Sequence, residues 1–230
     1  ADQTVSVSTT DDDVAGFTIV ELDGSTEVDE SGDTDTFTVV LDAQPTSDVV
    51  ITITSSDTGE ATVTSTLTFT PANWDTPQVA TITGVDDDII DGSQTSTITV
   101  SIDDANSDDD FDVIADQTVS VSTTDDDVAG FTVSETQGST GVDESGTTDI
   151  ITVVLNAQPA SDVVMAISSS DASETAVNGS TANNNSLTFT SANWDTPQSF
   201  TITGVDDDLV DGTVTVSYTH LRAHETRNYR

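Results

Sequence analysis

The chain has 230 residues, of which 43 are Asp or Glu and only three are Lys or Arg, so its formal net charge is −40 at pH 7. Because phosphate binding depends on Lys and Arg, this balance excludes nucleic acid and anionic membranes as partners, and no segment has the length and hydropathy for membrane insertion. The absence of cysteine excludes disulfides, thiolate metal sites and cysteine nucleophiles.

The chain opens with a segment that it later repeats. Residues 1–18 recur unchanged as residues 115–132, and the phrase ANWDTPQ around Trp74 returns around Trp194. A repeat of this length is too long for one turn of a solenoid and matches a whole small domain. The sequence therefore predicts tandem copies of one domain.

Short runs that alternate apolar with polar residues follow one another along each copy. Turn-forming segments such as DGS, ESGD, AQPTSD and SSDTGE separate them. This period of two predicts about seven strands with one buried face each, typical of an antiparallel β-sandwich. The residues expected on the buried faces of the first copy are Phe17, Ile19, Phe37, Val39, Leu41, Val49, Ile51, Ile53, Leu67, Phe69, Ala80, Ile82, Ile98, Val100, Ile102, Val119 and Val121.

The predicted fold class is all-β, with tandem Ig-like antiparallel sandwiches. Residues 1–13 are expected to be the last strand of a preceding repeat, and residues 14–127 to form one complete sandwich. Residues 128–215 are expected to form a second sandwich that breaks off before its closing strands and leaves an open edge. Residues 216–230 hold every cation of the chain, Arg222, Arg227 and Arg230 with His220 and His224, and are expected to be a non-native, adapter-derived tail.

Acidic residues gather in three groups per copy. The first contains Glu30 or Glu144, and the second is the strand-end run with Asp86, Asp87 and Asp91, or Asp206, Asp207 and Asp211. The third is the interdomain run of Asp125, Asp126 and Asp127. Hard cations such as Ca²⁺ take six to eight oxygen ligands, so converging carboxylates with no Lys or Arg nearby favour a calcium site. Solvated or halophilic acidity is the alternative, and it is the preferred interpretation for Asp103, Asp104 and residues 108–110.

The phrase LTFTPANWDTPQVATITGVDDDIIDG, followed by a strand and VSVSTTDDDVAGF, resembles the Calx-β domain of sodium–calcium exchangers and large bacterial surface proteins. The resemblance covers the chain up to about residue 215. It implies calcium ligands at Glu30, Asp86, Asp87, Asp91, Asp125, Asp126 and Asp127, and the repeat extends the set to Glu144, Asp206, Asp207 and Asp211. The family usually has an Asp-Tyr pair in the loop where this chain has SSDTGEATV, so either Glu60 or Asp57 is the substitute there or one ligand is missing.

The sequence offers few side chains that could act as a nucleophile or a general base, because residues 1–215 contain no His, Lys, Arg or Cys. The predicted role is therefore a non-catalytic, calcium-stiffened structural or adhesive repeat of a large extracellular or cell-surface bacterial protein. Its expected partners are calcium ions, neighbouring repeats and a cell-surface or matrix ligand. The alternative is a sandwich that binds a glycan or protein and is acidic only for solvation.

Overall fold

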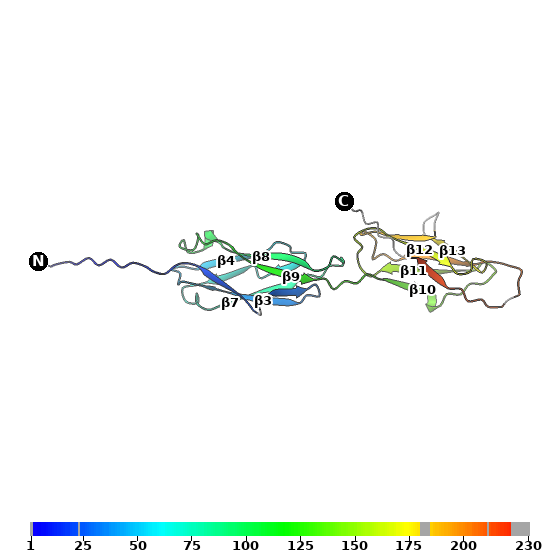
Figure 1. Cartoon of the computed structure of the whole chain (residues 1–230), viewed down its shortest axis with the longest axis horizontal. Coiled ribbons are helices and arrows are strands. Elements are labelled where there is room, and N and C mark those ends of the chain that lie inside the picture. The colour runs from blue at the N-terminus through cyan, green and yellow to red at the C-terminus, as the bar shows by residue number, and fades with distance from the viewer. Residues whose placement is uncertain (1, 23, 180–184, 211, 222–230) are drawn as a thin grey trace. The chain divides into compact units, whose positions relative to one another are not determined.

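A computed structural model describes residues 2–22, 24–179, 185–210 and 212–221. The chain divides into two compact units, and the boundary along the chain falls between Asp126 and Asp127. A short piece of the chain before this boundary, Asp88–Ile90, groups with the second unit. Figure 1 shows that each unit is built from β-strands. No helix among the described residues has the length and apolar character that crossing a membrane requires.

Two sheets form the first unit within the described residues, which confirms the predicted all-β sandwich (Figure 1). All neighbouring strands are antiparallel except β2 and β9, which run parallel. One sheet has the order β1 (Phe17–Glu21), β3 (Thr34–Leu41), β7 (Gln78–Gly84), β5 (Ala61–Val63). The other has the order β2 (Thr26–Asp29), β9 (Gln117–Thr124), β8 (Gln94–Ile102), β4 (Val49–Ser55), β6 (Thr66–Phe69).

The predicted alternation appears directly in the burial of these strands. Along β3, Phe37, Val39 and Leu41 are buried, while the residues between them stay partly exposed. Successive side chains of a strand point to opposite faces, so every second residue enters the space between the sheets. The predicted inward residues all lie in this core, except that Ile19 is only partly buried against it.

One sequence adopts two states in this chain. Residues 117–124, QTVSVSTT, form β9 between β2 and β8, whereas the identical residues 3–10 form no strand and are exposed. That residues 1–13 close a preceding repeat stays a prediction, because the described residues hold no such repeat for them to pair with. A strand needs partners for its backbone groups, and the described structure places none beside residues 3–10.

In the loop between β8 and β9, Asp104, Asp109 and Asp110 are exposed as predicted, whereas Asp108 departs from the prediction of a solvated loop. The loop begins with the short helix η1 (Asp104–Asn106), after which Phe111 enters the core and Asp108 is only 4% exposed. Asp108 Oδ2 accepts hydrogen bonds from the amide and hydroxyl of Thr46 and from the amide of Ser47, at 2.6–2.8 Å. The acid is buried because its carboxylate satisfies three donors of the β3–β4 turn.

Replacing Asp108 is expected to destabilise the first unit. Its hydrogen bonds, first that from the Thr46 hydroxyl, lower the pKa of Asp108 from 3.8 to about 2. The depressed pKa means that the ionised acid stabilises the fold above pH 3.8 and loses this effect as the pH falls towards 2. Asp108→Ala should lower the unfolding free energy at neutral pH by about 2 kcal/mol, measured by denaturant unfolding. The exposed Asp109→Ala is the control, and equal losses in both variants would refute the role of these hydrogen bonds.

The second unit repeats the first sheet but not the second. Its four-stranded sheet has the order β10 (Phe131–Glu135), β11 (Thr148–Leu155), β15 (Gln198–Gly204), β13 (Thr175–Gly179), as in β1-β3-β7-β5. The other sheet has only β14 (Ser186–Phe189), β12 (Val163–Ser169) and β16 (Tyr218–Leu221) among the described residues. A short helix, η2 (Thr136–Gly138), follows β10.

Strand β16 lies within the segment predicted to be non-native. It pairs antiparallel with β12, as β8 pairs with β4 in the first unit. The three arginines and His224 of that segment lie outside the described residues.

Candidate metal centre

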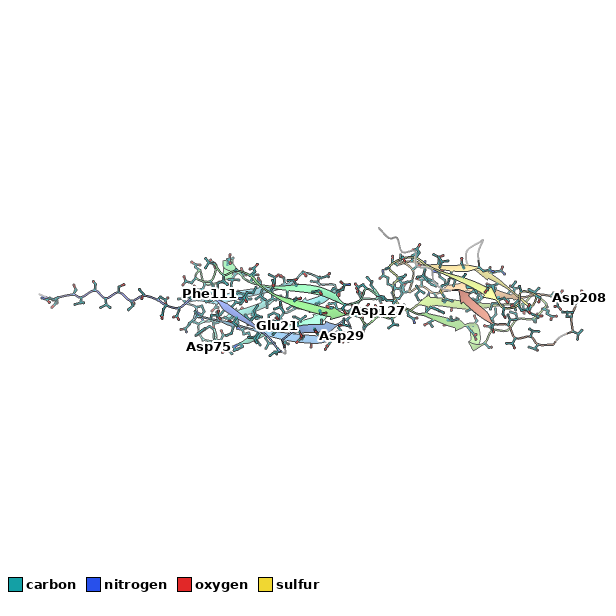
Figure 2. The ribbon with its side chains drawn as sticks, in the orientation of Figure 1. Glu21, Asp29, Asp75, Phe111, Asp127 and Asp208 are labelled. Carbon is teal, nitrogen blue, oxygen red and sulfur yellow. The ribbon has the colours of Figure 1, made fainter. Side chains whose placement is uncertain are left out.

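The candidate site lies at one end of the first unit, where four loops meet. Glu30 follows β2, Glu60 precedes β5, Asp87 and Asp91 lie between β7 and β8, and Asp125 follows β9. Figure 2 labels Asp29 at this end and Asp75 at the opposite end of the unit. The site is therefore assembled from both sheets of the sandwich.

Backbone pairing fixes where Glu30 sits. Asp29 pairs with Thr124 at the ends of the parallel strands β2 and β9, and the Glu30 amide then donates to the Thr124 carbonyl at 3.2 Å. Gly84, the last residue of β7, permits this course, because a Cβ there would lie 1.9 Å from the Asp29 carbonyl oxygen. The end of β2 thus passes directly over β7, and Glu30 is carried between the sheets.

Glu60 is held on the other side of the site by its backbone carbonyl. That carbonyl accepts the Val85 amide at 2.9 Å and the Thr123 hydroxyl at 3.4 Å. Asp125 ties the β7–β8 loop to the end of β9, since its Oδ2 accepts the Gly92 amide at 2.8 Å. Backbone amides and the Thr123 hydroxyl therefore hold these two acids in place, and the acids do not hold one another.

Glu30 is the most unusual residue of the site. Its side chain is 1% exposed, and its Oε2 is buried without a hydrogen-bond partner; the Oε2 atom of Glu60 is buried and unpartnered in the same way. A buried polar atom without a partner costs about 1–3 kcal/mol, and more when it is charged. Such an atom in a native fold indicates a partner of another kind.

Carboxylates converge on Glu30 here within the described residues, and Asp87 offers a ligand atom within 4.8 Å of it. One ligand atom from each of Glu30, Glu60 and Asp91 lies within 4.8 Å of the others. Two unit charges 4 Å apart repel by about 1 kcal/mol in water and about 4 kcal/mol at an effective dielectric constant of 20. The first 215 residues contain no Lys, Arg or His to offset this repulsion.

The electrostatics of the cluster appear in two raised pKa values. Burial, and then repulsion by Asp87, Asp125, Glu60 and Asp91, raises the pKa of Glu30 from 4.5 to about 7. Burial, and then repulsion chiefly by Asp91 and Asp87, also raises the pKa of Glu60. Asp87 and Asp125 therefore lie close enough to act on the same point, although neither belongs to the convergent trio.

The donor set fits a hard divalent cation. All the convergent groups are carboxylates, and two of them present a buried oxygen without a hydrogen-bond partner. Calcium prefers six to eight oxygen ligands, including carboxylate and backbone carbonyl oxygens, and does not require a rigid geometry. Glu30, Glu60 and Asp91 would hold the ion, with Asp87 and Asp125 as the nearest further acids.

Without calcium, the first unit is expected to lose stability as the pH rises from 4.5 to about 7. A raised pKa means that folded Glu30 retains its proton over a range in which the unfolded chain has lost it, so a rising pH favours unfolding. With calcium, the stabilisation should instead increase with pH, because the ion must displace that proton. Denaturant unfolding in chelator and in calcium across this pH range would measure both slopes, and a rising slope in chelator would contradict the burial of Glu30.

The other residues of the predicted set fall outside the trio. Asp86 and Asp126 are exposed, while the neighbouring acids Asp87, Asp125 and Asp127 are partly buried. Neither Asp86 nor Asp126 joins a convergent acidic group among the described residues. Alternation explains this, because neighbouring residues of an extended segment point to opposite sides. Asp127 belongs to the second unit. The family resemblance pointed to the loop containing Glu60, but the sequence alone left open whether Glu60 or Asp57 would face the site.

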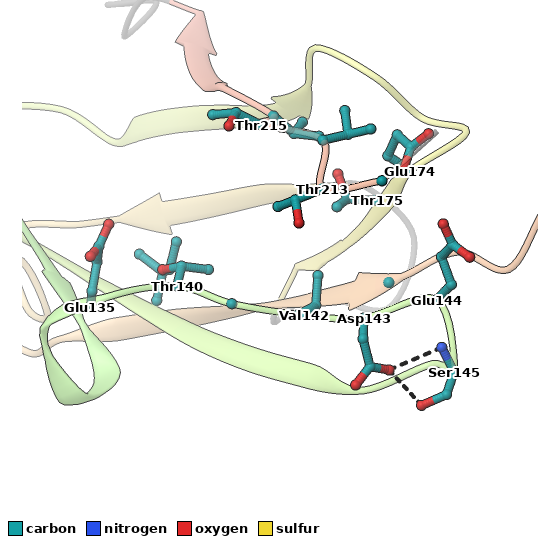
Figure 3. Close-up of a pocket in the computed structure, with 16 residues that line it drawn as sticks. Glu135, Thr140, Val142, Asp143, Glu144, Ser145, Glu174, Thr175, Thr213 and Thr215 are labelled. Carbon is teal, nitrogen blue, oxygen red and sulfur yellow. Dashed lines mark hydrogen bonds between the residues drawn. The ribbon is translucent and has the colours of Figure 1, made fainter. Parts of the chain in front are cut away.

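Among the corresponding acids of the second unit, Glu144 is more exposed than Glu30. Glu144 and Asp207 are partly exposed and Asp206 is exposed, while Asp211 lies outside the described residues. Asp207 Oδ1 accepts the Leu209 amide at 2.7 Å. Glu144 and Glu174 line a cleft (Figure 3) and form no convergent acidic group there within the described part of the unit.

Comparison with known proteins finds no matching family model and no matching curated protein. Solved structures resemble the chain only distantly. CBD12 from CALX1.2 is 16% identical over 82% of this chain and 74% of its own, with a TM-score of 0.35. The calcium binding domain CBD12 of CALX1.1 is 15% identical over 83% and 76%, with a TM-score of 0.35. The S-layer protein rSbsC(31-844) is 16% identical over 81% and 22%, also with a TM-score of 0.35. Similarity at this level assigns no function to the chain.

Proposed function

We propose that the chain is a non-catalytic, calcium-stabilised structural module, with the ion bound by Glu30, Glu60 and Asp91 in the first unit. The observation that carries this proposal is the buried Oε2 atom of Glu30, which has no hydrogen-bond partner and lies among acids with no cationic side chain to neutralise them. A divalent cation is the partner that satisfies both the oxygen and the charge.

The position of the site explains what the ion would do mechanically. Glu30 follows a strand of the β2-β9-β8-β4-β6 sheet, Glu60 precedes a strand of the other sheet, and Asp91 lies in a loop that connects the two. A shared ion would cross-link the sheets at the end where β9 leaves the unit. Ligand present at one hundred times its dissociation constant stabilises the folded state by about 2.7 kcal/mol, a large part of a domain's net stability.

The extracellular setting belongs to the same proposal. Low-affinity calcium sites are filled where calcium is abundant, as in extracellular modules with dissociation constants of about 10⁻⁴–10⁻³ M. The resemblance of residues 67–92 and 119–131 to Calx-β repeats of surface proteins supports a place in an extended cell-surface or secreted protein. In that setting calcium would stiffen the module, and neighbouring repeats would be its structural partners.

A calcium titration of the first unit's thermal unfolding tests the proposal. Trp74 packs against the first core and Trp194 against the second, so in a Trp194→Phe background the fluorescence of Trp74 reports the first unit alone. Its melting temperature should rise with calcium, fall again with chelator, and respond less to magnesium, which demands octahedral geometry and keeps its waters. A melting temperature that calcium leaves unchanged would sink the proposal.

A further inference from the structure

Asp91 and Gly92 follow each other between β7 and β8, and both residues are exposed. Neither belongs to a strand, since β8 begins only at Gln94. Gly92 has a φ of +73°, in the left-handed region that favours glycine, and a Cβ at this residue would meet nothing within 4 Å beyond its chain neighbours. The backbone nitrogen of Gly92 is therefore not shielded by a side chain of its own or by packing around it.

An aspartate that precedes such a glycine can react with the backbone. The amide nitrogen of the glycine attacks the side-chain carboxyl carbon and closes a five-membered succinimide ring, and the hydroxyl of the carboxyl group leaves as water. A second water then opens the ring at either carbonyl, which restores aspartate or leaves the chain linked through the side-chain carboxyl as isoaspartate. One water is released and one is consumed, so the net change is a rearrangement that needs no oxidant or reductant.

A third residue, Asp125, is placed to assist the attack. An amide nitrogen is a poor nucleophile until it gives up its proton, and Asp125 Oδ2 accepts the hydrogen bond of the Gly92 amide at 2.8 Å. This distance lies within the reach of a general base, about 2.6–3.2 Å. Asp125 would take the proton as the nitrogen attacks Cγ of Asp91 and pass it to the leaving hydroxyl. Electrophile, nucleophile and base thus lie side by side.

We propose that Asp91–Gly92 is a self-modification site, where the ion-free protein converts Asp91 to isoaspartate with Asp125 as the general base. The product carries the Cβ of residue 91 in its main chain and the free carboxylate directly on Cα. That carboxylate is one of the three that converge with Glu30 and Glu60. Its displacement removes a ligand from the candidate metal centre, and calcium added afterwards does not restore it.

Calcium opposes this modification, a part of the inference that rests on the proposed function. An ion bound to the Asp91 carboxylate keeps its oxygens from leaving and its carbon from turning towards the Gly92 nitrogen. Only the ion-free molecules then react, so calcium at one hundred times its dissociation constant should reduce the rate to about one-hundredth. A molecule kept without calcium would accordingly record that period as a permanent loss of calcium affinity.

Ageing the full chain in chelator, in water labelled with heavy oxygen, measures the reaction, because each ring opening adds one labelled oxygen to the residue. Peptide mass spectrometry locates the label, and isoaspartate at residue 91 also resists proteases that cut before aspartate. Asp23–Gly24, whose glycine has a φ of +82°, gives the background rate of the same dipeptide in the same molecule. A carboxylate is a weak base, so residue 91 should gain label about tenfold faster than residue 23, below the about 10²–10⁴-fold of a base with a matched pKa.

Two variants test the role of the base in chelator. Asp125→Asn keeps a hydrogen-bond acceptor that cannot take a proton, and it should slow residue 91 to the rate of residue 23. Asp126→Asn removes the same charge from the exposed neighbouring acid and should leave the rate unchanged.

Equal labelling of residues 91 and 23 in the unchanged chain, or an undiminished rate in Asp125→Asn, would overturn the proposal. Fast labelling of residue 91 that saturating calcium does not slow would support the modification and refute calcium binding by Asp91. The failure of the modification and the failure of the proposed function therefore give different results.

Discussion

Glu30→Gln is expected to raise the melting temperature of the first unit in calcium-free buffer above pH 7 and to lower it in saturating calcium. Without the ion, the variant removes a buried charge that repels Asp87, Asp125, Glu60 and Asp91. Its gain should be about 1–3 kcal/mol, the range for an uncompensated buried polar group. With the ion, the variant loses a carboxylate ligand and the stabilisation that comes with binding. The order of the two proteins therefore reverses when calcium is added.

The Trp194→Phe background again isolates the first unit, and the measurement is a pair of thermal melts in chelator and in calcium. Asp75→Asn is the matched control, because Asp75 is exposed at the opposite end of the unit (Figure 2). It removes the same charge and should shift either melt by less than about 0.5 kcal/mol. If the same protein, Glu30→Gln or the unchanged chain, has the higher melting temperature in both buffers, Glu30 is not a ligand.

Gly84→Ala is expected to destabilise the first unit and to weaken calcium binding together. A Cβ at residue 84 would lie 1.9 Å from the Asp29 carbonyl oxygen, a backbone atom that cannot rotate away. The end of β2 must then move and carry Glu30 with it. Overpacking of this kind costs about 1–3 kcal/mol, occasionally more, and a displaced ligand should reduce calcium affinity at least about tenfold, as supporting residues of metal sites do.

Denaturant unfolding and calorimetric calcium titration of Gly84→Ala measure the two effects. Gly59→Ala is the control, since a Cβ there meets only the Asp57 side chain, at 3.2 Å, and Gly59 lies beside Glu60 in the sequence. It should leave the calcium affinity within a few-fold of the unchanged chain. A Gly84→Ala protein that unfolds more readily but binds calcium normally would show that the close contact between Gly84 and Asp29 does not position the calcium ligands.

The two copies of QTVSVSTT show where prediction from sequence ends for the fold. Alternation identified the strand and its inward face, and Val119 and Val121 are buried as expected. It could not show which of the two copies finds partners in this chain, because pairing depends on neighbours distant in sequence. The same limit applies to residues 108–110. Their acidity indicated a solvated loop, yet Asp108 is buried because the β3–β4 turn presents donors to it.

The acids that the sequence indicated include some that gather at the site and some that do not. The sequence pointed to Glu30, Asp87, Asp91 and Asp125, which all act on the pKa of Glu30 or belong to the convergent trio. It also pointed to Asp86 and Asp126, which the structure leaves exposed. A run of consecutive acids gives composition but not direction, and direction is set by which residues of the run continue the inward face of the preceding strand.

Composition and periodicity by themselves determined that this chain forms acidic β-sandwiches whose carboxylates have no cationic partners of their own, because these properties depend only on residue type and local alternation. Only the tertiary structure decided which carboxylate loses its solvent. Glu30 and the exposed Glu27 are both acids near the end of β2. Glu30 alone is carried between the sheets, because Gly84 lets β2 pass over β7 and Thr124 holds its amide there. Alternation puts Glu30 on the inward face with Thr26 and Val28, but how completely that face loses its solvent depends on packing between segments far apart in the chain.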